Sequence, residues 1–267
     1  MSEVKIRGIV LDSLNYEEND KIITVYSDEF GKLSFIALGA NKASSKNNYS
    51  LNVFSESDFE IFKSRKTQSI SKLKTGILVR NNFKIAKSYN NYLFASIISS
   101  VILQEELFYN KDFKLFDMLR EAIKNINDEV NPFSNMVWFL FYSLKNFGGY
   151  WELNKCYRCN KASKIYRKFD LQHYGLVCPN CINENEEEHD YEFIKYLQRM
   201  DNNTFFTIQK FPINVSFEII ISKLLFSYYL NEIGIYSYPM NEILKKEVYK
   251  DDTFWEYTHK VLTKNSI

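Results

Sequence analysis

Apolar and polar residues alternate in short runs over about the first eighty positions, and turn-forming residues separate these runs. The pattern predicts five strands, at residues 4–14, 21–27 and 32–38, within residues 49–64, and within residues 68–79. Tight turns are expected at residues 28–31 and 64–67. Five short antiparallel strands of this kind fit a small barrel. An OB-fold is the leading interpretation and an SH3-like barrel is the alternative, because a count of strands does not separate them.

The spacing of apolar residues becomes helical from Phe83 onward, since Leu93, Ile97, Val101 and Phe108 recur near the repeat of one helix face. Further helices are predicted at residues 113–126, 133–147, 191–200, 215–233 and 248–262. Pro132 suits the start of the second of these, and the pair Gly148-Gly149 suits its end. The acidic residues 184–190 are expected to form a solvated linker, or to place favourable charge at the start of the next helix.

All four cysteines lie in one segment, as Cys156-Tyr157-Arg158-Cys159 and Cys178-Pro179-Asn180-Cys181. Two intervening residues let a tight turn direct both thiolates at one ion, and a second such pair completes a tetrahedral shell. We therefore predict one structural zinc ion held by Cys156, Cys159, Cys178 and Cys181, because four thiolates leave no position for a catalytic water. Two disulfides or a redox CxxC pair are the alternatives, and His173 is a possible substitute ligand or an ordinary loop histidine.

These elements predict an α+β fold with several domains. An OB-fold barrel occupies residues 1–81, and a helical domain is built from residues 82–149 and 190–267. A four-cysteine zinc finger at residues 150–189 interrupts the helical domain.

The formal net charge is only +1, but its distribution is uneven. Residues 1–30 carry three Lys or Arg against seven Asp or Glu, whereas residues 31–90 carry eleven against three. Cations spread along a groove bind phosphates, and exposed aromatic rings such as Tyr49 add stacking platforms for single strands. Tyr26, Phe35 and Phe62 are further aromatic candidates. The basic candidates for nucleic-acid contact are Lys32, Lys42, Lys46, Arg65, Lys66, Lys72, Lys74 and Arg80.

Sequence motifs for catalysis are missing, including phosphate loops, HExxH and GxSxG. Glu17, Glu18 and Asp20 are the candidate carboxylates for metal-assisted hydrolysis, although solvated loop charge is the simpler interpretation. No stretch reaches the roughly eighteen uncharged apolar residues of a membrane span, and the first residues do not read as a secretory leader. We expect a cytoplasmic protein without enzymatic activity.

Several segments resemble the bacterial DNA repair and recombination mediators of the RecO family. Residues 8–11, 16–20, 28–32 and 37–42, together with Thr24, are similar to the opening of that family. Residues 149–153 before the first cysteine pair, and 175–177 before the second, are similar to its zinc-bearing branch. The resemblance spans most of the chain, and beyond Asp190 it rests on helical character alone. One departure is Asn160, which stands where glycine is usual and which tolerates the left-handed conformation of such a turn.

The resemblance implies a non-catalytic protein that binds single- and double-stranded DNA and anneals complementary strands. It implies action with RecR and with single-stranded DNA-binding protein to help load RecA, at the bacterial nucleoid. DNA contact then falls on Lys32, Lys42, Lys46, Arg65 and Lys66, and a groove for the acidic tail of single-stranded DNA-binding protein falls in the helical domain. The alternative is a zinc-ribbon protein that binds RNA or associates with transcription.

Overall fold

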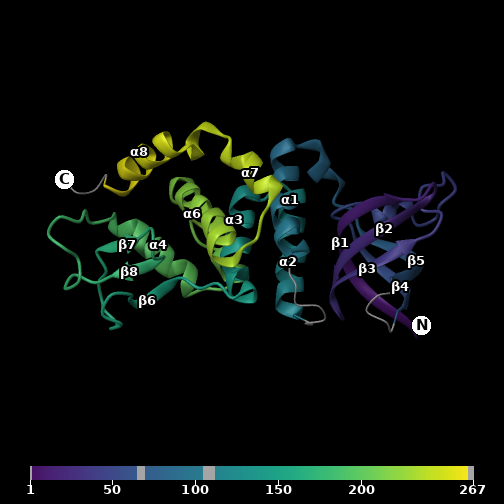
Figure 1. Cartoon of the computed structure of the whole chain (residues 1–267), viewed down its shortest axis with the longest axis horizontal. Helices are drawn as coiled ribbons and strands as arrows, with labels where there is room; N and C mark the ends of the chain where they lie inside the picture. Colours follow the sequence, from purple (N-terminus) through teal and green to yellow (C-terminus); the bar gives the residue numbers. More distant parts are fainter. Residues whose placement is uncertain (1, 65–69, 105–111, 264–267) are drawn as a thin grey trace. The chain divides into compact units, whose positions relative to one another are not determined.

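The computed structural model of the chain describes residues 2–64, 70–104 and 112–263, and Figure 1 labels its elements. The chain divides into two compact units, residues 1–139 and residues 140–267. In the part of the chain that is described, every helix is too short or too polar to cross a lipid bilayer.

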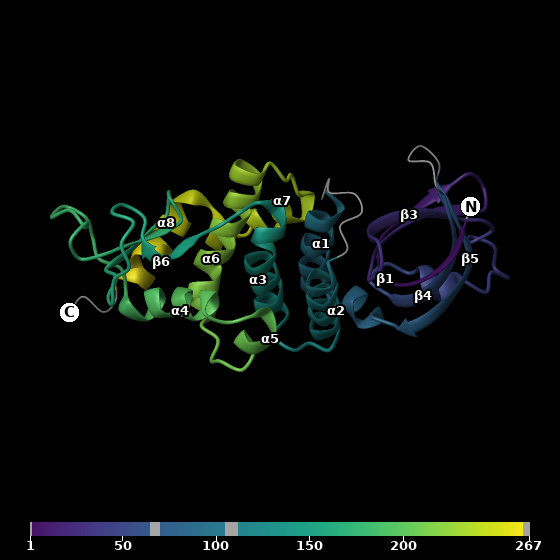
Figure 2. The ribbon, with the colours of Figure 1, turned by 90° about the horizontal axis from the view of Figure 1, so that it is seen from below.

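Five strands form a closed barrel in the first unit (Figure 2). They are β1 (Ser2–Tyr16), β2 (Asp20–Ser27), β3 (Gly31–Ala37), β4 (Glu56–Lys63) and β5 (Ser71–Arg80). The order is β1-β2-β3-β5-β4, and β1 pairs with β4 to close the sheet. Only β3 and β5 run parallel, and the other neighbours are antiparallel. This is the strand order of the Greek-key OB barrel, so the predicted OB-fold is confirmed.

Apolar residues of β1 to β4, which alternate with polar ones, fill the barrel. Ile23 and Val25 of β2 point inward with Phe35 and Ala37 of β3, and all four are buried. Phe35 packs against Phe59 of β4 with ring centroids 5.2 Å apart. Burying a side chain of this size stabilises the fold by about 1.5–3 kcal/mol. The barrel is therefore held by a core of its own.

The first unit also contains helices, of which the first lies between β3 and β4 and the others follow β5. They are η1 (Asn48–Leu51), η2 (Phe83–Lys87), α1 (Tyr89–Leu103), α2 (Phe113–Asn127) and α3 (Pro132–Ser143), the last of which runs across the division between the units. Ser88 caps α1 by accepting a hydrogen bond from the Asn91 N–H, and Asp112 caps α2 in the same way. The predicted helices are confirmed here, and Phe108 lies outside the described residues.

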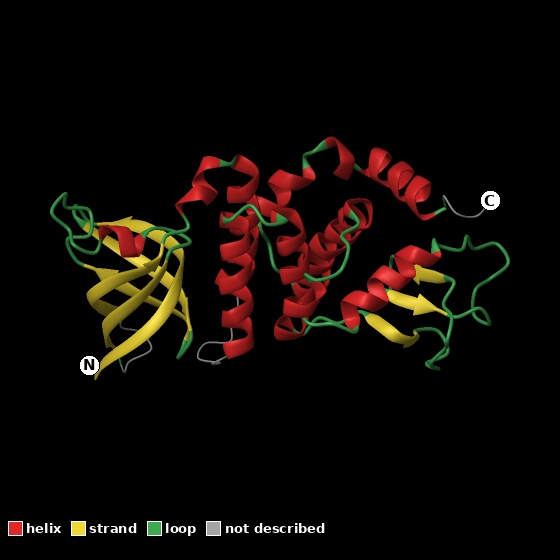
Figure 3. Ribbon diagram, turned by 180° about the vertical axis from the view of Figure 1, so that it is seen from behind, coloured by secondary structure: helices red, strands yellow, loops and turns green. Residues whose placement is uncertain are grey.

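The second unit combines a small sheet with helices (Figure 3). Its elements are η3 (Leu144–Phe147), β6 (Glu152–Cys156), β7 (Lys168–Asp170), β8 (Gly175–Val177), α4 (Tyr191–Asp201), α5 (Phe205–Ile208), α6 (Val215–Tyr228), η4 (Tyr229–Ile233), α7 (Tyr238–Leu244), η5 (Glu247–Tyr249) and α8 (Asp251–Leu262). The sheet has the order β6-β8-β7. The sequence did not anticipate these strands or the short helices α5 and α7, because a run of three to seven residues shows too little periodicity.

Aromatic side chains attach the small sheet to the helix that follows it. Trp151 packs against Phe169 of β7 with ring centroids 5.4 Å apart, and Phe169 packs against Phe193 of α4 at 6.3 Å. All three side chains are buried. The four-cysteine segment is therefore built on a supported sheet, although most of its chain is loop.

Candidate metal centre and nucleic-acid surface

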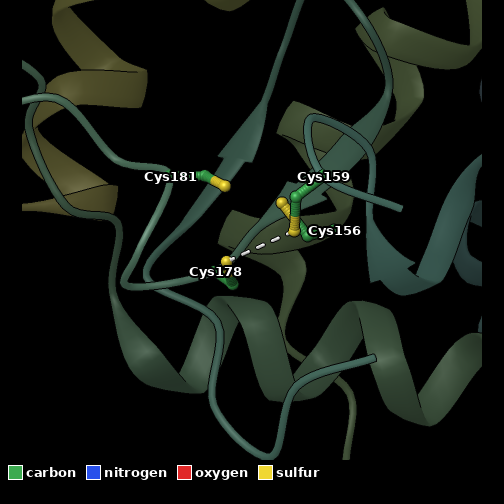
Figure 4. Close-up of side chains that lie close together, drawn as sticks. All are labelled: Cys156, Cys159, Cys178 and Cys181. Atoms are coloured by element: carbon green, nitrogen blue, oxygen red, sulfur yellow. Dashed lines mark hydrogen bonds between the residues drawn. The ribbon is translucent and has the colours of Figure 1, made fainter. Parts of the chain in front are cut away.

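The four cysteines meet at one end of the small sheet. Cys156 is the last residue of β6, and Cys178 directly follows β8. These two strands are parallel neighbours, with Cys156 paired to Leu176, so the two cysteines leave the sheet side by side. The two turns that follow bring in Cys159 and Cys181 (Figure 4). All four Sγ atoms lie within 4.8 Å of one another, so the predicted ligands are brought together.

The spacing of these sulfur atoms fits a tetrahedral metal ion. The Sγ atoms of Cys159 and Cys178 are 3.9 Å apart. Four sulfur atoms at zinc–thiolate bond length occupy a tetrahedron whose edges are about 3.8 Å. All four cysteines are free, and a disulfide would bring two sulfur atoms to about 2.05 Å. The donor set and its geometry match a metal site, and they do not match a pair of disulfides.

The acidities of the thiols point in the same direction. Burial raises the pKa of Cys156, but backbone hydrogen bonds from Cys178 and Cys159 outweigh burial and lower that pKa to about 6. Interaction with the thiols of Cys159 and Cys178 raises the pKa of Cys181 to about 12. The Cys156 thiolate therefore forms readily, whereas the neighbouring thiols oppose ionisation of Cys181. A bound cation removes this opposition, because it stabilises all the thiolates at once.

Each cysteine pair encloses a tight turn. The Asn160 N–H donates to the Cys156 carbonyl at 2.8 Å, and the Cys181 N–H donates to the Cys178 carbonyl at 3.0 Å. Asn160 has a φ of 59°, in the left-handed region where glycine and asparagine are favoured. The expectation that asparagine replaces glycine here by adopting this conformation is confirmed.

Other candidate ligands lie apart from the cysteines. The Nδ1 atom of His173 is 3.0 Å from an Asp170 carboxylate oxygen, and its ring stacks on Tyr157. Asp20 accepts a hydrogen bond from the Gly39 N–H and so braces a barrel loop. Within residues 2–64, 70–104 and 112–263, the cysteines are the one group of three or more His, Cys, Asp or Glu residues placed to share a metal. Among the described residues, neither His173 nor the acidic residues near Asp20 belong to a group that could share a metal.

The acidic run at residues 184–190 forms ion pairs within the finger, where the sequence predicted a solvated linker. Glu186 pairs with Arg158 and Lys168, and Glu188 pairs with Arg167. Three cations of the finger are therefore neutralised by carboxylates that follow the second cysteine pair. The expected helix-start charge is confirmed at the end of this run, where Asp190 caps α4.

Two of the predicted basic residues lie in the loop between β3 and η1. Lys42 and Lys46 are exposed, and neither forms an ion pair with any residue that the structure describes. Tyr49 lies three positions beyond Lys46, in η1, and 72% of its surface is exposed. The Asn47 side chain accepts a hydrogen bond from the Gly76 N–H of β5, which fixes the end of this loop to the barrel. Lys42, Lys46 and Tyr49, called here the loop patch, combine charge with an aromatic face.

The remaining basic candidates on the barrel differ in their surroundings. The Lys32 ammonium donates to the Leu103 carbonyl at 2.7 Å, so it binds the end of α1. Lys74 contacts carboxylates of Glu3 and Glu60, and Arg80 contacts Glu56.

Lys72 is exposed at the start of β5, beside Ile36 of β3. Arg65 and Lys66 lie outside the described residues. Of the aromatic candidates, Tyr26 and Phe35 are buried, Phe62 is half-buried, and Tyr49 is exposed. The whole basic set stays a prediction, and the loop patch joins two of its exposed lysines to an exposed aromatic ring.

A closed OB barrel, followed by helices that a four-cysteine module interrupts, defines a multidomain protein of the OB-fold class. Comparison with known families agrees with this architecture. The family described as "Recombination protein O N terminal" matches residues 1–82, and "Recombination protein O C terminal" matches residues 86–239. The chain therefore belongs to the recombination protein O (RecO) family.

Relatives at the level of whole chains agree with this assignment. The chain is 33% identical over 241 residues to the DNA repair protein RecO of Mycoplasma mycoides. This alignment covers 89% of the chain and 96% of that protein. It is 32% identical over 239 residues to the DNA repair protein RecO of Mycoplasma capricolum, with the same shares covered. Identity falls to 22% over 233 residues with the DNA repair protein RecO of Caldicellulosiruptor saccharolyticus.

Proposed function

We propose that the chain is a non-catalytic DNA-binding recombination mediator that acts in DNA repair. It binds single- and double-stranded DNA, anneals complementary strands, and helps to load RecA on DNA coated with single-stranded DNA-binding protein. The match of both RecO families along the chain is the observation that carries this proposal. The names of its relatives, DNA repair protein RecO, support the role in repair.

The barrel supplies the DNA contacts in this proposal. Cations of the loop patch bind phosphates, and Tyr49 offers a ring on which an unpaired base stacks. Lys72, Arg65 and Lys66 are proposed as further phosphate contacts, and Lys32, Lys74 and Arg80 contribute where phosphate competes with their present partners. Screening of the repulsion between two strands keeps them together long enough to pair. This mechanism needs no covalent step, which agrees with the absence of catalytic motifs in the sequence.

Zinc is the metal that we assign to the four cysteines. Thiolates are soft ligands, and a tetrahedral four-sulfur set is typical of zinc in a structural role. Cys156, Cys159, Cys178 and Cys181 would each supply one thiolate, and one ion would be bound per chain. The ion supplies no chemistry to a substrate, because all four positions are taken. Its role is to hold two loops together in a module whose own sheet has only three short strands.

Protein partners complete the proposed role. These are RecR, the acidic C-terminal tail of single-stranded DNA-binding protein, and RecA indirectly. The tail is proposed to bind in the helical part of the chain. Co-elution of the purified chain with each partner tests these contacts one at a time, and failure to co-elute with either RecR or the tail removes that partner from the proposal.

A competition between nucleic acids tests the DNA preference directly. Labelled single-stranded DNA bound to the full chain is displaced by unlabelled DNA or RNA of the same sequence. We expect DNA to compete at least as well as RNA. A clear preference for RNA would contradict the proposal and would favour a zinc-ribbon RNA-binding protein.

A further inference from the structure

One side chain connects the two cysteine pairs. Arg158 lies between Cys156 and Cys159, and its Nη1 atom donates to the backbone carbonyl of Cys181 at 2.7 Å. The same guanidinium binds both carboxylate oxygens of Glu186, with each N–O distance at 2.6 Å. A residue of the first turn therefore holds the backbone of the second turn.

Glu186 has further partners that fix its position. Lys168 of β7 donates to it at 3.0 Å, and the Asn183 N–H donates at 2.9 Å. The side chains of Arg158 and Glu186 are only 23% and 20% exposed. A bidentate Arg–carboxylate pair that is partly shielded from water is stronger and more directional than an exposed contact.

The pair closes the segment that holds the metal ligands. Arg158 and Glu186 are 28 positions apart, and Cys159, Cys178 and Cys181 all lie between them. Cys156 is already fixed by the pairing of β6 with β8. The three remaining cysteines lie in loops between Arg158 and Glu186. The ion pair holds the two ends of this segment together.

Another ion pair of the same module offers an internal comparison. Arg167 and Glu188 make one contact at 3.0 Å, and their side chains are 48% and 51% exposed. Among the contacts that the structure describes, neither side chain reaches a cysteine side chain or a cysteine carbonyl. Exposed pairs of this kind contribute little to stability, at most about 1 kcal/mol.

We propose that Arg158 and Glu186 are positioning residues for the metal, which hold the two cysteine turns at the separation that four-sulfur coordination needs and so slow release of the ion. This inference rests on the proposed zinc site. Groups that orient metal ligands from outside the coordination shell typically change metal affinity by about 10–100-fold when they are removed. The hydrogen bond to the Cys181 carbonyl and the anchored carboxylate are the means by which Arg158 acts.

Zinc release from the full chain tests the inference. The variants are Arg158→Met, Glu186→Gln and the double variant, and the matched control is Arg167→Met. Each is loaded with zinc, and transfer of the ion to a chromogenic chelator gives the release rate. We expect about 10–100-fold faster release in the two single variants, no further increase in the double variant, and a change of less than about twofold in the control.

A cobalt-substituted sample separates positioning from loss of a ligand. Because all four thiolates remain, Arg158→Met should keep the absorption bands of tetrahedral four-sulfur cobalt while it binds the ion more weakly. Arg158→Lys should not restore slow release, since lysine keeps the charge but cannot form the paired contact. If Arg158→Met does not fold, Glu186→Gln decides the question.

Two results have different meanings. Release from Arg158→Met and Glu186→Gln within twofold of the unsubstituted chain would overturn the positioning role and leave the zinc site intact. Absence of bound metal from the unsubstituted chain would instead overturn the zinc assignment itself.

Discussion

Removing two cations from the loop patch should change how strongly salt weakens DNA binding. Lys42→Ala combined with Lys46→Ala removes two exposed ammonium groups that have no carboxylate partner among the described residues. Each phosphate contact to a single strand contributes about 0.7 to the slope of log affinity against log salt concentration. We therefore expect the slope to become shallower by about 1.4, because two counterions fewer are released on binding.

The same change predicts a loss of affinity. The affinities of the variant and of the unsubstituted chain converge near 1 M salt, where counterion release no longer contributes. A slope change of 1.4 then corresponds to an affinity about tenfold lower at 0.15 M salt. Fluorescence anisotropy with a labelled single strand, repeated over a range of salt concentrations, gives both quantities.

A control variant separates a local contact from net charge. Lys210→Ala combined with Lys260→Ala removes the same formal charge from exposed positions in the second unit. The control should keep the slope of the unsubstituted chain. An unchanged slope in the loop-patch variant would refute our reasoning, and an equal change in both variants would show that net charge, rather than the loop patch, is responsible.

Three further outcomes follow from the finger. Cys178→Ser should lose the metal and unfold the finger while the barrel, which has its own core, stays folded; retention of one metal per chain by elemental analysis would contradict this. Asn160→Val should destabilise the finger by about 1–2 kcal/mol in denaturant melts, because a β-branched side chain opposes the positive φ at this position. Asn160→Gly should not destabilise it, and equal stabilities of the two variants would argue against backbone strain at residue 160. Burial lowers the pKa of His189 to about 4, so its imidazole should titrate far below 6.5 by NMR. The folded state should lose stability as the pH falls from 6.5 towards 4, and a titration midpoint near 6.5 would contradict this burial.

The sequence predicts the barrel well because its strands are long enough to alternate. β1 to β4 each carry buried apolar residues into a core, so the period of two is visible over seven or more residues, whereas β5 contributes only the partly buried Leu73. The cysteine site is predicted for a different reason. Metal ligands are few, chemically distinctive and close in sequence, so their spacing alone specifies the turn geometry.

Pairing between distant charges could not be predicted in the same way. Arg158 and Glu186 are far apart in sequence, and nothing in their spacing indicates that they meet. For the same reason Lys74 and Lys42 are both predicted from the sequence to contact nucleic acid, although Lys74 contacts two carboxylates across the barrel strands. Such contacts depend on strand register and loop path, which are properties of the folded chain.

Strand annealing is the measurement that tests the proposed function most directly. Two complementary labelled oligonucleotides are mixed with the purified full chain in the absence of ATP, and duplex formation is followed over time. Our account predicts that the chain accelerates annealing, and that Lys42→Ala combined with Lys46→Ala reduces the acceleration. Annealing no faster than without protein, from a folded chain that contains its metal, would contradict the proposal that this RecO-family protein is an annealing mediator.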